Sequence, residues 1–217
     1  MEQFLAETEY FDISDPIIKI HLEKLDLSAL SDKEKAIKLF YHVRDSIKYS
    51  VKPVDLKKTT YIASHVLQQA KSFCIPKAIA LGTLARAVGI PSRLHFVDFI
   101  NHRLSANLEQ LWGTNVMAGH CYTELYLNGK WVKATVSLDK ITCAKHKFRP
   151  VEFDGENDAL LFDTDQEGRP HAEYIADHGT HSDMSLKLVT NIFESTYGPI
   201  NKEFIDRNFQ SSETTFK

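Results

Sequence analysis

Cys74 is the residue in this chain whose type and position first suggest nucleophilic chemistry. It lies in residues 72–77 (SFCIPK), where Pro76 suits the first turn of a helix because the N–H that proline lacks has no intrahelical partner there. Apolar residues recur at helical spacing over 75–88, and Gly-Ile-Pro at 89–91 ends the helix. Unpaired N–H groups at a helix start favour a thiolate, so we expect a thiol pKa below about 8.5. The competing interpretation is a buried cysteine that packs as a small hydrophobic residue.

A base and a carboxylate are predicted on a hairpin further along the chain. Residues 119–137 are rich in β-formers around Asn128-Gly129, which is typical of a tight type I′ turn. A two-residue turn places His120 opposite Ser137, and the alternation of side chains puts His120 and Asp139 on one face. A carboxylate there can hold one imidazole nitrogen while the other faces a thiol, which is the arrangement of a catalytic triad.

This order of motifs resembles the transglutaminase-like superfamily. The matching features, over roughly residues 33–140, are Cys74, the helix end LARAVGIPSR (84–93) and the hairpin from Gly119-His120 to Trp131-Val132, with VRDSIKY (43–49) similar to the lead-in. The resemblance implies an α+β, papain-like fold with helices packed on an antiparallel sheet and the nucleophile at a helix N-terminus. It also marks the chain as a divergent, bacterial-type member.

The chain departs from the family pattern at the third catalytic residue. In the family that residue follows the hairpin tryptophan by four positions, and here this position is Thr135. Threonine cannot act as a carboxylate. Asp139, on the same face of the hairpin, is the predicted replacement, and Asp98 is the second choice.

The resemblance implies that Cys74 attacks an amide carbonyl of a peptide or protein and forms an acyl-enzyme, with His120 as base and then acid. The Cys74 N–H is the expected oxyanion donor, and Gln68 or Gln69 is a candidate second donor. Water as acceptor gives peptidase, amidase or deamidase activity, and an amine gives transglutamination. No cofactor or metal is expected.

Two other functions remain open at this point. Thr135 favours a catalytically inactive domain of the same fold that binds a protein or peptide in the cleft. An arylamine acyltransferase shares the same residue types, but it would need an acyl-thioester cofactor, which no feature of the sequence supports. The histidines and acidic residues of 171–183 fit no standard zinc spacing.

Composition limits the alternatives further. The 217 residues are 43% hydrophobic and 25% charged, which is typical of a globular domain, and the net charge of −3 argues against nucleic-acid binding. The start of the chain has no signal-peptide pattern, and no apolar run could span a membrane, so a cytoplasmic location is expected. Three irregularly spaced cysteines indicate neither a disulfide framework nor a zinc site.

We predict a helical lead-in (1–30), one domain (31–200) with a loop-rich extension after 140, and a polar tail (201–217). Capping signals and periodicity predict these elements: a helix from Asp15-Pro16, a helix from 31 to about 47 opened by the Ser31–Glu34 capping box, a short helix over 65–71 capped by Ser64, a strand over 93–99, a helix over 104–111, a strand over 173–176 and a helix over 186–195 capped by Ser185.

Overall fold

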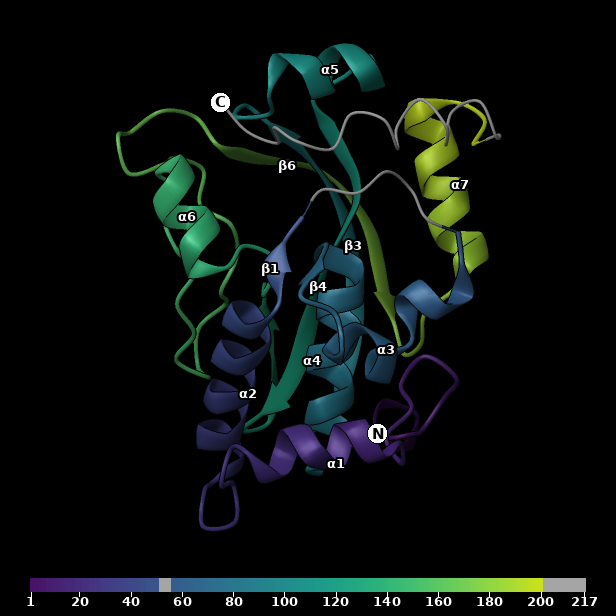
Figure 1. Cartoon of the computed structure of the whole chain (residues 1–217), viewed down its shortest axis with the longest axis vertical. Helices are drawn as coiled ribbons and strands as arrows, with labels where there is room; N and C mark the ends of the chain where they lie inside the picture. The colour runs from purple at the N-terminus through teal and green to yellow at the C-terminus, as the bar shows by residue number, and fades with distance from the viewer. Residues whose placement is uncertain (51–55, 201–217) are drawn as a thin grey trace.

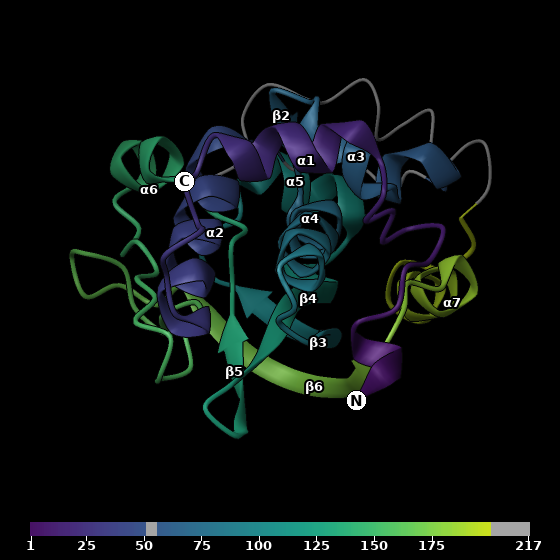
Figure 2. The same ribbon diagram turned by 90° about the horizontal axis from the view of Figure 1, so that it is seen from below.

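The computed structural model describes residues 1–50 and 56–200. Its centre is a four-stranded antiparallel sheet with the order β5-β4-β3-β6. The strands are β3 (Ser92–Asn101), β4 (Val116–Leu127), β5 (Lys130–Ala134) and β6 (Ala172–His181). Figures 1 and 2 show the helix α4 (Cys74–Ala87) lying along the concave face of this sheet. The predicted α+β class, with helices packed on an antiparallel sheet, is confirmed.

The helix α4 is the core of the molecule. Every residue from Ile75 to Arg86 is buried, because the sheet covers one side and α1 (Pro16–Glu23), α2 (Asp32–Ser46) and α3 (Ala63–Leu67) cover the others. A helix that is apolar on all sides must be buried in this way. Enclosure by other elements fixes the position of its first residue, Cys74.

The N-terminal elements follow their sequence signals closely. Asp15 caps α1 by accepting the N–H of Ile17, and Ser31 and Glu34 form the predicted capping box of α2. A short parallel pair, β1 (Lys48–Tyr49) with β2 (Lys71–Ser72), follows. Because β2 is separated from α4 by one residue, this pair sets Tyr49 near the start of α4.

The hairpin has the predicted register but a shorter second strand. Leu127 pairs with Lys130 around a turn in which Asn128 and Gly129 both have positive φ, as a type I′ turn requires. The strand was predicted to reach residue 137, but β5 ends at Ala134. The next N–H, of Thr135, is taken by the carbonyl of Ala159 rather than by β4.

Several other elements differ from the prediction. The short helix α3 begins at Ala63, so Ser64 lies inside it and does not cap it, and residues 71–72 form β2. The N–H groups of Ala63 and Ser64 are bound instead by Tyr10 O and Asp12 Oδ1, from a segment distant in sequence. The remaining helices are α5 (Ala106–Trp112), the unpredicted α6 (Lys140–His146), α7 (Leu186–Tyr197), and the short 3₁₀ helices η1 (Glu2–Phe4) and η2 (Lys58–Tyr61).

The predicted tail over 201–217 lies outside the described residues. Within residues 1–50 and 56–200, no helix combines the length and apolar character needed to cross a membrane.

Candidate active site

Cys74 is the first residue of α4, as predicted. The preceding residue, Phe73, is extended and supplies no side-chain cap, so the first N–H groups of the helix are left to other acceptors. The N–H groups of Cys121, Ile75 and Cys74 itself lie close enough to the Cys74 sulfur to lower its pKa. Burial outweighs them and raises the pKa of the thiol above its ordinary value. The expected low thiol pKa is therefore wrong, because desolvation of the sulfur exceeds the effect of the helix N-terminus.

His120 lies on β4 and is almost fully buried, with 3% of its surface exposed. Its ring packs edge-on against Phe99 at 5.1 Å between centroids and lies 6.4 Å from the ring of Tyr174. Burial in this aromatic setting lowers the pKa of His120 to about 3. His120 is therefore a neutral imidazole at neutral pH, and its Nε2 has no hydrogen-bond partner among the described residues.

The structure brings Cys74 and His120 to the same place. One of the N–H groups that lower the pKa of Cys74 belongs to Cys121, the residue directly after His120 on β4. Tyr174 is a neighbour of both, since its ring lies beside His120 and a charge on Cys74 would raise the pKa of its hydroxyl. The helix start and the middle of β4 therefore lie close together, and Cys74 is partly exposed.

Asp139 has a different role from the one predicted. It is the N-cap of α6: Oδ1 accepts the N–H of Thr142 at 3.0 Å, and Oδ2 accepts the Thr142 hydroxyl and the N–H of Tyr49, both at 2.7 Å. These donors and the nearby Lys77 lower the pKa of its carboxyl against the effect of burial. None of its hydrogen bonds reaches His120, so this geometry does not support Asp139 as the residue that orients the base.

The second-choice carboxylate is also engaged elsewhere. Asp98 Oδ1 accepts the N–H of Gly119 and binds His178 Nε2, each at 2.8 Å. Thr135, which stands at the family's third catalytic position, is buried, and its hydroxyl has no hydrogen-bond partner among the described residues.

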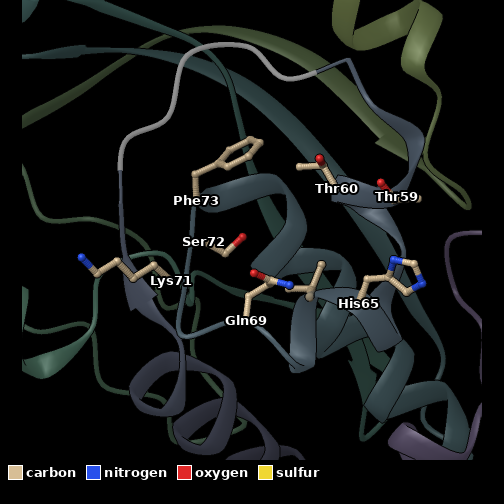
Figure 3. A pocket seen from close by; sticks show the side chains of 8 residues that line it. Thr59, Thr60, His65, Gln69, Lys71, Ser72 and Phe73 are labelled. Carbon is tan, nitrogen blue, oxygen red and sulfur yellow. The ribbon is translucent and has the colours of Figure 1, made fainter. Parts of the chain in front are cut away.

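Gln68 and Gln69, the candidate second oxyanion donors, lie on the segment that precedes β2. Gln68 Nε2 donates to the carbonyl of Ser64 at 3.0 Å, within its own helix turn. Gln69 lines an open pocket of about 190 Å³ on the N-terminal side of Cys74, together with Thr59, Thr60, His65, Val66, Lys71, Ser72 and Phe73 (Figure 3). Of the predicted oxyanion donors, the Cys74 N–H lies beside the Cys74 sulfur.

Lys77 is a functional neighbour that the sequence analysis missed. Its side chain is completely buried one turn after Cys74, and Nζ donates to the carbonyls of Arg44 at 2.9 Å, Ile47 at 2.6 Å and Ser137 at 2.9 Å. Burial lowers the pKa of Lys77 to about 7, while the carboxylate of Asp139 raises it. The ammonium thus ties the start of α4 to the end of α2 and to the segment that follows β5. A lysine inside an apolar helix was the available signal.

Two comparisons relate this chain to known proteins. The family model of the transglutaminase-like superfamily matches residues 22–136. The fold is similar to a crystal structure from Cytophaga hutchinsonii of a protein provisionally assigned as a cysteine protease, with 15% sequence identity and a TM-score of 0.46. That match covers 79% of this chain and 62% of the other, and no curated protein matches significantly.

Residues 1–50 and 56–200 contain no cluster of three or more His, Cys, Asp or Glu side chains that could hold a metal ion. The matched region of the family model spans more than half of the chain and contains Cys74, His120 and Thr135. The chain belongs to the transglutaminase-like superfamily.

Proposed function

We propose that this protein is a cysteine-dependent enzyme that cleaves or transfers amide acyl groups of peptides or proteins through an acyl-enzyme on Cys74. The observation that carries the proposal is the closeness of the Cys74 sulfur, at the start of α4, to the N–H that follows His120 on β4. This closeness supports a site in which a nucleophile, a neutral base and an N–H donor for the developing oxyanion act together.

The chemistry follows from the two shifted pKa values. At neutral pH the resting pair is a thiol and a neutral imidazole, so His120 takes the proton of Cys74 as the sulfur attacks the carbonyl carbon. The Cys74 N–H donates to the oxyanion of the tetrahedral intermediate. The C–N bond then breaks, the imidazolium of His120 gives its proton to the leaving amine, and a thioester remains on Cys74.

The second half of the cycle repeats these roles with an acceptor. His120 removes a proton from water or from an amine, which attacks the thioester carbonyl and releases the thiol of Cys74. Water yields a carboxylic acid, as in a peptidase or deamidase. An amine yields a new amide, as in a transglutaminase.

Acylation by p-nitrophenyl acetate, followed by intact-mass and peptide mass spectrometry, tests the proposal without knowledge of the substrate. We expect one acetyl group on Cys74 and turnover of the ester, none in Cys74→Ser, and a rate lowered by about 10²–10⁴-fold in His120→Ala. Cys143→Ala is the matched control, because it removes a buried thiol of α6. Casein with a fluorescent amine then separates ammonia release, chain cleavage and amine incorporation.

Thr135 and the raised thiol pKa favour a second candidate, an inactive domain that binds a peptide in the same cleft. In that case Cys74 would acquire no acetyl group at any pH at which the protein is folded, and His120→Ala would change nothing. That result would overturn the enzymatic proposal.

A further inference from the structure

A small, partly open cavity of about 10 Å³ lies beside His120. It is formed where β1, β3 and β4 meet the segment that follows β5 and the segment that precedes β6. The lining residues are Tyr49, Phe99, Asn101, His120, Ser137, Leu138, Leu161 and His171.

Three of these lining side chains carry a buried polar atom that has no hydrogen-bond partner among the described residues: His120 Nε2, Ser137 Oγ and His171 Nδ1. The side chains belong to residues that are only 2–3% exposed. A buried polar group without a partner destabilises the fold, so three around one cavity point to a shared partner. A cavity of at least about 10–15 Å³ with two to four polar neighbours holds one water molecule.

We propose that one water molecule occupies this cavity and links His120 to Ser137 and His171, so that these two residues position the catalytic imidazole in place of the family's carboxylate. The proposal rests on the function proposed above. It explains why Thr135 can stand at the family's third catalytic position. The partners of His120 are then Ser137, two positions after Thr135, and His171, directly before β6.

The hydrogen-bond directions are set by the chemistry of the three groups. The water accepts from Nε2–H of His120 and donates to Nδ1 of His171 and to Oγ of Ser137. This tautomer leaves Nδ1 of His120 unprotonated and therefore able to take the proton of Cys74. His171 can accept at neutral pH because burial lowers its pKa to about 4.

Both partners are held rigidly. The ring of His171 stacks on Phe148 at 4.1 Å between centroids, and its backbone N–H and carbonyl bind Asp163 and His102. The carbonyl of Ser137 is fixed by the buried ammonium of Lys77 at 2.9 Å. A water molecule held by such neighbours has a fixed place, so it can hold the imidazole in one orientation.

The first test compares the pH–rate profiles of Cys74 acetylation in Ser137→Ala and His171→Phe, which removes Nδ1 but keeps a stacking ring. We expect each variant to lower the rate about tenfold through the loss of one hydrogen bond to the water. Ser137→Asp puts a carboxylate in the place of the water, so the acid limb of its profile should move to higher pH. Thr83→Val, which removes a buried hydroxyl of α4 outside the cavity, is the matched control and should leave the profile unchanged.

The second test does not require activity. A high-resolution crystal structure should show an ordered water within hydrogen-bond distance of the three atoms, and ¹⁵N NMR should show the Nε2–H tautomer of His120. A dry cavity, or Ser137→Ala and His171→Phe profiles that match the unsubstituted protein, would overturn the inference. If His120→Ala also left acetylation unchanged, the proposed function itself would fail, and the crystal structure would still decide whether the water is present.

Discussion

At the scale of single residues, the site is governed by the cost of burying charge. A helix N-terminus stabilises an anion by about 0.3–1 kcal/mol, and removal of the charge from water opposes this effect. Burial therefore has the larger effect on the pKa of Cys74, although three N–H groups lie near its sulfur. The same effect lowers the pKa of His120, so neither member of the pair carries a charge until the reaction begins.

The pKa of His120 predicts how stability depends on pH. The unfolded chain takes up a proton near pH 6.5, whereas the folded chain does so only near pH 3, so stability is complete above the first value and falls as the pH drops toward the second. From neutral pH to about pH 4, His120 should remove about 3 kcal/mol of unfolding free energy. Urea unfolding should show that the free energy of unfolding decreases less between neutral pH and about pH 4 in His120→Gln than in the unsubstituted protein. The exposed His65→Gln is the control, and an equal loss in His120→Gln would contradict the prediction.

The proposed nucleophile and base could be predicted from the sequence because each carries a local signal, a helix start for Cys74 and a hairpin for His120. Lys77 carries one signal, its place in an apolar helix, and Ser137 and His171 carry none. Their roles depend on carbonyls, cavities and rings that come from segments far away in the chain. A residue-by-residue interpretation finds the groups that react but not the groups that hold them in place.

At the scale of elements, helix ends that are capped from within a few residues were predictable. The Ser31–Glu34 box, the Asp15 cap and the Ser185 cap all lie where their motifs indicate. Where the capping groups are remote, prediction failed, as at α3, whose first N–H groups bind Tyr10 and Asp12. The helix α6 was missed because Asp139 was interpreted as a catalytic carboxylate rather than as an N-cap.

Substitution of Asp139 separates these two roles. Asp139→Ala should destabilise the protein by about 1–2 kcal/mol, because α6 loses its cap and the N–H of Tyr49 loses its acceptor. The pH–rate profile of Cys74 acetylation should keep its shape. Asp139→Asn is the matched variant, since it keeps an acceptor for Thr142 and should recover part of the lost stability in thermal unfolding. A shift of the acid limb in Asp139→Asn would restore Asp139 as the residue that orients His120.

At the scale of the whole molecule, two buried cations, Lys77 and Arg86, fix the two ends of α4. Near the start of α4, Lys77 binds carbonyls from α2 and from the segment after β5. Near its end, Arg86 donates to the carbonyls of Ala6, Ser92 and Ser182 and packs over the ring of Phe11 at 3.7 Å. Each cation joins α4 to parts of the chain that are distant in sequence. The two ends of α4 are therefore held by hydrogen bonds to other elements of the fold.

Replacing Lys77 should disturb both stability and the site. Lys77→Met leaves three buried carbonyls without their donor, so we expect a loss of about 2–4 kcal/mol of unfolding free energy. The anchor of Ser137 is lost as well, so acetylation of Cys74 should also slow. Urea unfolding and the ester assay measure the two effects, and the exposed Lys71→Met should show neither. A stable Lys77→Met with an unchanged rate would show that the ammonium is dispensable.

Under the proposed function, the proton that burial holds on Cys74 also bears on how long the protein stays active. Peroxide attacks a thiolate much faster than a thiol, and oxidation beyond the sulfenic acid is not reversed in most proteins. A nucleophile that ionises only as it attacks its substrate presents little thiolate to oxidants between catalytic cycles. An imidazole without a carboxylate beside it is a weaker base, and that weakness keeps the sulfur in the reduced state that the next reaction requires.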